Sequence, residues 1–174
     1  GGIYFNSGNN SLTDYSITNC KAETNGSAVH MASANTLTVK NGNYKNNTVN
    51  NQNGGAISAT NDNSSTKIYF EGEPYIYDNV GPDNKQHNVA LNMNRTTVIN
   101  SNTNGLGENA RIGVYVPDSF YNDRGAKYKV FGTYDSNKEN LDTFINDRNQ
   151  LIGESEGTRN IAWSTGYKLV LDPN

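Results

Sequence analysis

The chain has 174 residues and a formal net charge of -3, with 33% hydrophobic and 18% charged residues. This size fits one domain, or one domain with an appendage. Lys and Arg are scattered, so we expect no nucleic-acid partner, and no apolar run approaches the ~20 residues that span a bilayer, so we expect no membrane insertion by this fragment.

Asparagine is unusually abundant: the sequence contains 31, of which 21 lie in the first 100 residues. Asparagine tolerates left-handed backbone and hydrogen-bonds to its own main chain, so this abundance favours an architecture with many similar tight corners. Cys20 is the single cysteine and cannot form an internal disulfide. No Cys/His cluster has zinc spacing, and we expect no metal and no cofactor.

Two short motifs repeat in step along the first 80 residues. The first motif is a small residue followed by an apolar–polar–apolar triplet, and it occurs at Gly2–Phe5, Ala28–Met31 and Ala56–Ala59. The second motif ends in a corner residue, and it occurs at Ile17–Cys20, Tyr44–Asn47 and Ile76–Asn79. Separations of 26 to 32 residues are typical of solenoids, in which each repeat buries its apolar face on the next.

The segments between the Asn/Gly clusters are short and alternate with period two, as at Leu37–Val39 and Ile68–Phe70, which indicates strands. Short strands joined by corners and stacked coil on coil make a parallel β-helix. In this fold, four sets of residues should each stack in a column. These are Ile3, Val29 and Ile57 inside, beside Phe5, Met31 and Ala59; Cys20, Asn47 and Asn79 at a corner; and Tyr4, His30 and Ser58 facing solvent.

The repeat resembles one found in bacterial surface proteins. Gly54–Ile57 together with Tyr44-x-x-Asn47 is similar to the GGA(I/L/V)…FxxN repeat of right-handed parallel β-helices, including the polymorphic outer-membrane adhesins. Ile76-x-x-Asn79 departs from the motif, and Ile17-x-x-Cys20 loses the Asn. The resemblance covers roughly residues 1–80. It implies a right-handed parallel β-helix displayed outside the cell, on a bacterial surface or cell wall.

The composition changes near residues 100–110, where charged residues become denser. We therefore assign residues 1–105 to β-helix coils, truncated at the N-terminus, and residues 106–174 to the last coil and a C-terminal cap. Later segments, at Asn88–Leu91, Ala110–Val114 and Tyr167–Leu171, look similar to the C-terminal part of adhesin-like surface proteins of gut Firmicutes. The predicted class is all-β with a cap containing a short helix and antiparallel strands.

The cap is predicted from local spacing. Leu141, Phe144 and Ile145 lie at i, i+3 and i+4, which indicates a short amphipathic helix. The segments Leu151–Ile152, Ile161–Trp163 and Tyr167–Leu171 are separated by turn residues and predict a small antiparallel meander.

Polysaccharide lyases and glycosidases also use the parallel β-helix, which makes the acidic and histidine side chains candidate catalytic groups. Glu71 and Glu73 share a strand face, but a solvated strand end explains them as well. His30 and His87 have no partners at triad spacing. Asp135-x-Asn137-x-Glu139 imitates the start of a calcium loop but lacks its Gly and its final acid. We assign no catalytic residue.

Tyrosine is the remaining signal, with 11 residues against 5 Phe and 1 Trp. Exposed aromatic rings stack on sugars or anchor protein partners. The predicted ligand-binding residues, outward by strand alternation, are Tyr4, His30, Tyr69, Tyr75 and Tyr77. The predicted function is a non-catalytic cell-surface adhesin or stalk module binding host or dietary glycan, or a surface protein. The alternative is the C-terminal fragment of a β-helical polysaccharide lyase or glycosidase whose active site lies upstream.

Overall fold

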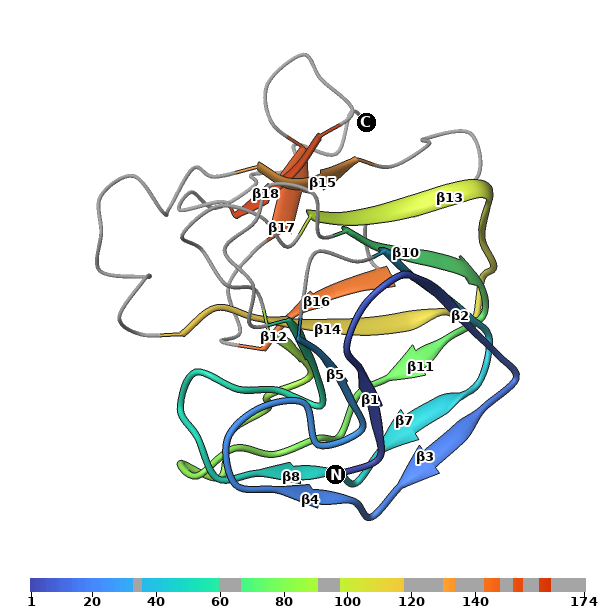
Figure 1. The fold of residues 1–174 in the computed structure, drawn as a ribbon. Coiled ribbons are helices and arrows are strands. Elements are labelled where there is room, and N and C mark those ends of the chain that lie inside the picture. The colour runs from blue at the N-terminus through green and yellow to red at the C-terminus, as the bar shows by residue number, and fades with distance from the viewer. Residues whose placement is uncertain are drawn as a thin grey trace, which may run out of the picture.

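The structure is a computed structural model, and it describes residues 1–32, 36–59, 67–90, 98–117, 130–133, 143–147, 152–154 and 160–163. The described residues form a parallel β-solenoid of about three turns, nearly all β, with essentially no helix. This confirms the predicted fold class. Figure 1 shows equivalent strands stacked along the coil, from blue β2 and β3 to yellow β13 and β14.

Three successive coils carry equivalent strands. The first contains β1 (Ile3–Phe5), β2 (Asn9–Thr13), β3 (Ser16–Thr18) and β4 (Lys21–Ala22). The second contains β5 (Val29–Met31), β6 (Thr36–Lys40), β7 (Asn43–Lys45) and β8 (Thr48–Val49). The third contains β9 (Ile57–Ala59), β10 (Lys67–Gly72) and β11 (Tyr75–Ile76), followed by a parallel bridge from Val80 to Thr48.

The predicted inner columns are confirmed by the strand register. Ile3 pairs with Val29 and Val29 with Ile57, all in parallel strands, and the column continues through Val89 of β12 (Val89–Ala90). Phe5, Met31 and Ala59 pair in the same way. From the second coil on, these inner side chains are almost completely buried, and the hydrophobic core runs as one cluster along the coil axis.

The outer column differs from the prediction at Ser58. Tyr4 is 62% exposed and His30 is half-buried, but Ser58 is only 3% exposed. The loop of the preceding coil lies over it, and the Gly26 N–H donates to Ser58 Oγ at 2.6 Å. Cys20 is partly buried and packs against the hydrophobic core.

The corners use left-handed backbone, as the asparagine content predicts. Asp14 and Asn41 have φ values of 59° and 53° at the turns after β2 and β6, and Gly72 has 64° at the turn after β10. A second set precedes the corner column: Asn19, Asn46 and Asp78 have φ values of 57° to 58°. Asn and Asp reach this region at low cost, so each coil can repeat the same two turns.

The fourth coil takes a shorter path. It contains β13 (Val98–Leu106) and β14 (Arg111–Tyr115). β14 pairs with β11 through Arg111 and Ile112, and with β12 through Val114 and Tyr115. β14 therefore belongs to two stacks, that of β11 and that of β12. In the first three coils these two stacks are connected by a corner and a loop, whereas in β14 only Gly113 separates them.

The prediction of a helix around residues 141–145 is wrong at Phe144 and Ile145, which the structure describes. Phe144 and Ile145 belong to β16 (Phe144–Asn146), which pairs in parallel with β14. Pairing with a strand about 30 residues earlier outweighs the local helical spacing. Leu141 lies outside the described residues, as do Asp135, Asn137 and Glu139.

Antiparallel strands follow, as predicted. β17 (Ile152–Glu154) pairs with β18 (Asn160–Trp163), and β18 pairs with β15 (Val130–Thr133). The final strand expected at 167–171 lies outside the described residues. The division at residue 105 stays a prediction. Within the described ranges, no helix has the length and apolar character needed to cross a membrane.

Candidate binding face and buried polar networks

The five predicted ligand-binding residues lie on three different stacks of strands. Tyr4 and His30 lie on β1 and β5, which are neighbours. Tyr69 lies on β10, whose neighbours are β6 and β13. Tyr75 lies on β11 and Tyr77 directly follows it, next to β7 and β14. The structure therefore brings these residues together as two pairs and one single tyrosine.

The Tyr4–His30 pair is held by a tilted ring contact with centroids 5.5 Å apart. His30 Nδ1 lies 3.4 Å from Ser58 Oγ. Burial lowers the pKa of His30 below its usual 6.5, against a smaller opposing effect of Ser58. Ser58 Oγ is buried and already accepts the Gly26 N–H, so this Ser–His contact is not placed to attack a substrate.

Tyr69 is half-buried and alternates with the buried Ile68 and Phe70. Its register partners are Thr38 and Asn100. The left-handed turn at Gly72 separates it from Tyr75, so the two tyrosines belong to different stacks.

Tyr75 and Tyr77 form the most organised surface cluster among the candidates. The Tyr75 hydroxyl donates to Asp78 Oδ2 at 2.7 Å. This hydrogen bond raises the pKa of the Tyr75 phenol, and burial and the Asp78 charge act in the same direction. The Arg111 guanidinium lies over the Tyr77 ring, with Cζ 4.2 Å from the centroid.

The register explains this arrangement. Ser16, Asn43, Tyr75 and Arg111 form one outward row along the coil axis. Continuing the register by one residue places Tyr77 beside Lys45, with Gly113 as its neighbour on the other side. Arg111, from the next coil, lies over the Tyr77 ring. We call Asn43, Lys45, Tyr75, Tyr77, Asp78 and Arg111 the tyrosine face.

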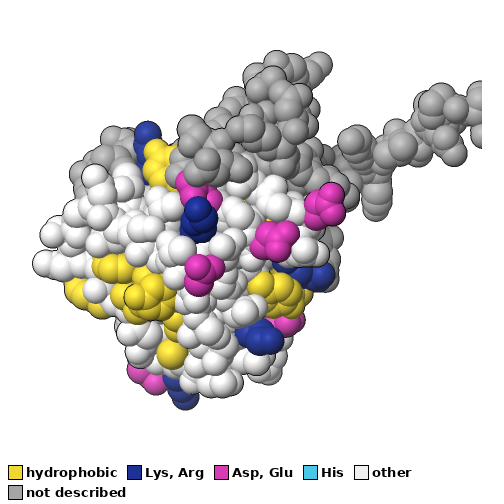
Figure 2. Space-filling view, turned by 90° about the vertical axis from the view of Figure 1, so that its right-hand side faces the viewer, with side chains coloured by type: hydrophobic (Ala, Val, Ile, Leu, Met, Phe, Trp, Pro, Cys, Tyr) yellow, Lys and Arg dark blue, Asp and Glu magenta, His cyan; other side chains and the backbone are white. Residues whose placement is uncertain are grey.

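One side of the molecule is shown in space-filling form in Figure 2. Uncharged polar side chains and backbone dominate that face, acidic and basic side chains are dispersed over it, and hydrophobic side chains form small separate patches. Binding through such a surface depends on individual aromatic and charged side chains rather than on an extended apolar area.

Beneath the surface, the predicted corner column is a continuous ladder of hydrogen bonds. The Oδ1 of Asn47 accepts the Cys20 N–H at 3.0 Å, and the Oδ1 of Asn79 accepts the Asn47 N–H at 3.0 Å. The Nδ2 groups of these two asparagines donate to carbonyls of the preceding coils, Ile17 O and Tyr44 O. Each amide therefore satisfies a neighbouring turn that is buried from water.

The ladder continues through Asn88 and reaches Asp147. Asn88 Oδ1 accepts the Asn79 N–H at 3.1 Å. Asn88 in turn donates its N–H and its Nδ2 to the two carboxyl oxygens of Asp147, at 2.8 and 2.7 Å. Burial raises the pKa of Asp147 to about 7, although the hydrogen bonds from Asn88 lower it. The ladder thus ends on a buried titratable group.

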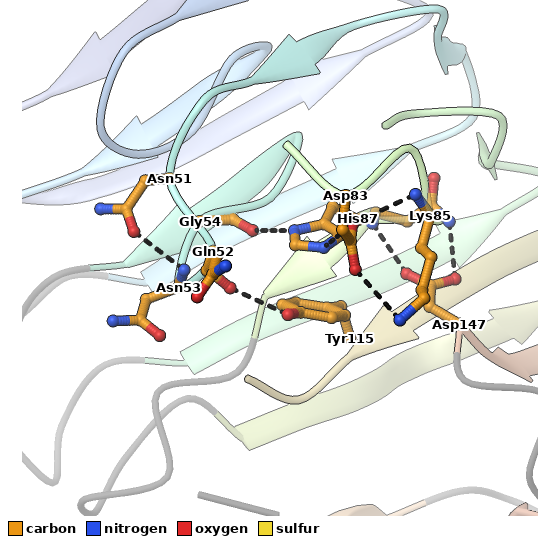
Figure 3. A network of polar contacts seen from close by, with 10 residues as sticks. Asn51, Gln52, Asn53, Gly54, Asp83, Lys85, His87, Tyr115 and Asp147 are labelled. Atoms are coloured by element: carbon orange, nitrogen blue, oxygen red, sulfur yellow. Dashed lines mark hydrogen bonds and ion pairs between the residues drawn. The ribbon is translucent and has the colours of Figure 1, made fainter. Parts of the chain in front are cut away.

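A second network surrounds His87, as Figure 3 shows. His87 is fully buried and its Nδ1 lies 3.0 Å from Gly54 O. Its Nε2 lies 3.2 Å from Asp83 Oδ1, within ion-pair distance but without hydrogen-bond geometry. The ring stacks on Tyr115 at 3.7 Å, and the Tyr115 hydroxyl donates to Gln52 O.

This network joins two loops to β14. His87 Nδ1 faces Gly54 O and Nε2 faces Asp83 Oδ1, so the ring contacts both loops while it stacks on Tyr115. Partial burial acts to raise the pKa of Asp83, but the Lys85 N–H, His87 and the Lys85 ammonium together hold it below its usual value. Because the imidazole is enclosed, it braces the loops and does not meet a ligand.

The two acidic residues considered for catalysis, Glu71 and Glu73, contact different partners. Glu71 is buried, with Oε2 3.8 Å from Lys40 Nζ. Glu73 is exposed and accepts a hydrogen bond from Asn109 Nδ2 at 3.1 Å. Gly72, in left-handed backbone, stands between them. Within the part of the chain that the structure describes, no three His, Cys, Asp or Glu side chains gather closely enough to hold a metal ion.

The sequence reading missed Asp147, Asn88 and the His87–Tyr115 stack. One signal was present for Asp147: Phe144-x-x-Asp147 is a copy of the Tyr44-x-x-Asn47 motif with Asp in place of Asn. Comparison of the chain with protein-family models, curated proteins and solved structures finds no match in any of the three.

Proposed function

We propose that this chain is a non-catalytic binding module of a bacterial cell-surface protein, an adhesin or stalk segment that contacts glycan or protein. The observation that carries the proposal is the tyrosine face, where two neighbouring tyrosines are held in place on the outside of a parallel sheet. The resemblance of Gly54–Ile57 and Tyr44-x-x-Asn47 to adhesin repeats supports display outside the cell.

The tyrosine face has the features that favour binding. The Tyr75–Asp78 hydrogen bond and the Tyr77–Arg111 stack restrict both rings before a ligand arrives, which lowers the entropy lost on binding. Tyr75 stands on β11 and Tyr77 directly follows it, so their spacing is kept by the coil. Aromatic rings presented in this way stack on sugar rings or fill pockets of a protein partner.

A glycan array and a protein-binding screen test this proposal with three proteins: the wild type, the Tyr75→Ala/Tyr77→Ala double variant and Tyr15→Ala. Tyr15 is 49% exposed outside the tyrosine face and serves as a matched control. We expect the wild type and Tyr15→Ala to bind the same ligand and the double variant to lose at least tenfold in affinity.

Two results would count against the proposal. A wild type that binds neither glycans nor proteins would remove the binding role. Release of sugar products from polysaccharides by the chain would favour the enzyme alternative instead. Thermal melts of the three proteins would show that any loss of binding does not come from unfolding.

A further inference from the structure

The tyrosine face carries two basic side chains that have no acidic partner. Arg111 and Lys45 are both exposed, and neither forms an ion pair with any residue that the structure describes. The nearby acid, Asp78, has one carboxyl oxygen occupied by the Tyr75 hydroxyl. This local arrangement contrasts with the whole chain, whose net charge is -3.

The contact between Arg111 and Tyr77 leaves the guanidinium able to bind an anion. The guanidinium Cζ lies over the ring, 4.2 Å from its centroid, and a guanidinium carries five N–H donors in one plane. That planar fork matches the two oxygens of a carboxylate and forms paired hydrogen bonds with it. The aromatic ring supports the cation without neutralising it.

The coil register places the other groups around this fork. Tyr75 is the direct neighbour of Arg111 in the outward row, and no cation covers its ring among the described residues. Lys45 lies beside Tyr77 on the opposite side from Arg111, one coil away. Tyr77 thus has a basic residue of each neighbouring coil beside it, and adjacent coils are spaced ~4.8 Å apart.

We propose that the tyrosine face binds an acidic polysaccharide rich in uronic acid, with Tyr75 against a sugar ring and Arg111 and Lys45 paired with carboxylates. This inference rests on the proposed function and narrows its ligand class. A carboxylate forms paired hydrogen bonds with the Arg111 guanidinium, and the apolar face of a sugar ring packs on Tyr75. The repeated negative charges of the polysaccharide match Lys45 and Arg111, which follow one another along the coil axis.

The test compares polygalacturonate with the same polymer after full methyl esterification, which removes the charge and keeps the backbone. Binding is measured by calorimetry for the wild type and for Arg111→Gln, Lys45→Gln and Lys21→Gln. Lys21 is exposed on β4, in a different stack, and is the matched control. We expect the wild type to prefer the acidic polymer at least tenfold, and this binding to weaken as salt rises.

Arg111→Gln should lower the affinity for polygalacturonate at least tenfold and Lys45→Gln several-fold, whereas Lys21→Gln should leave it unchanged. A calorimetric titration with dextran sulfate distinguishes binding of sulfate groups from binding of carboxylates. Binding of dextran sulfate without binding of polygalacturonate would overturn the uronate assignment. Equal binding of both pectin forms, lost in the Tyr75→Ala/Tyr77→Ala variant but kept in Arg111→Gln, would overturn this inference and leave the proposed function standing. A wild type that binds no glycan or protein would remove both.

Discussion

Two copies of one motif, Tyr44-x-x-Asn47 and Phe144-x-x-Asp147, occupy equivalent corners of the solenoid and differ in their polar atoms. Both aromatic side chains are buried, and both corner residues accept hydrogen bonds, Asn47 from the Cys20 N–H and Asp147 from Asn88, which directly precedes β12. Tyr44 adds a hydroxyl that Phe144 lacks. Asn47 has an amide that donates and accepts, whereas Asp147 has a carboxyl group that accepts through both oxygens.

The comparison shows why the repeat favours asparagine. A corner inside a stack must accept the N–H of one neighbouring turn and also satisfy a carbonyl of the preceding coil, and one amide does both. At the end of the ladder, Asp147 meets two donors of Asn88, so a carboxyl group can serve. Its burial is then unfavourable for the ionised form, which makes this corner sensitive to pH.

The largest effect is expected at the amide corner. Asn47→Ala leaves the Cys20 N–H and Ile17 O without their side-chain partner and removes the bond from Asn47 Nδ2 to Asn79 Oδ1. We expect the free energy of unfolding to fall by about 3–5 kcal/mol, because several buried polar groups lose their partners at once. Urea denaturation measures it. Asn43→Ala, exposed on the same coil, should change stability by less than about 0.5 kcal/mol, and an equal loss in both variants would contradict the ladder.

The second effect is the pH dependence at the acidic corner. The pKa of Asp147 is about 7 in the folded chain and 3.8 for the ordinary group. The folded state therefore holds the proton more tightly. This stabilisation is fully present below about pH 3.8 and is lost as the pH rises through about 7. At about 1.4 kcal/mol per pKa unit, the change is about 4 kcal/mol.

The measurement is the free energy of unfolding of wild type and Asp147→Asn from pH 4 to pH 8. His30, whose pKa is lowered by burial, contributes with the opposite sign in part of this range, so the difference between the two proteins isolates Asp147. We expect the wild type to lose stability relative to Asp147→Asn as the pH rises. Parallel curves would mean that the Asp147 carboxyl group titrates normally.

The third prediction concerns Gly113, which packs against the side chains of Asn88 and Asp147. A Cβ added at Gly113 would lie 2.2 Å from Asn88 Nδ2 and 2.5 Å from Asp147 Oδ1. Gly113→Ala should therefore displace the Asn88–Asp147 pair and cost about 1–3 kcal/mol. Thermal melts measure it, with Gly1→Ala as a control, because a Cβ there meets nothing closer than 3.7 Å. Stability equal to that of wild type would show that this corner can shift without loss.

The two corners were not equally predictable from the sequence. The columns Ile3–Val29–Ile57 and Cys20–Asn47–Asn79 were predicted because strand alternation and the repeat are both local patterns. Phe144 was placed in a helix because Leu141, Phe144 and Ile145 have helical spacing. Its actual partner is Ile112 on β14, 32 residues earlier, and the sequence signal for this pairing is the motif copy Phe144-x-x-Asp147 rather than the local spacing.

The surface was predictable only in part, for a related reason. Alternation indicates which tyrosines point outward, but not which of them share a stack. The turn at Gly72 sends Tyr69 to the stack of β6 and β10, and Tyr75 to that of β7 and β11. Arg111 belongs to the next coil, 34 residues after Tyr77. Its contact with the Tyr77 ring can therefore be recognised only once the coil register is known.

The smallest effect concerns the hydroxyl that distinguishes Tyr44 from Phe144. Tyr44 is completely buried, its hydroxyl has no hydrogen-bond partner among the described residues, and burial raises the pKa of its phenol. Tyr44→Phe removes a buried polar group and keeps the ring in the core, so we expect a gain of about 1 kcal/mol in the free energy of unfolding. The exposed Tyr15→Phe should be neutral in the same urea titration. A loss in Tyr44→Phe would show that the hydroxyl is bonded inside the core and that the two motif copies differ by more than their corner residue.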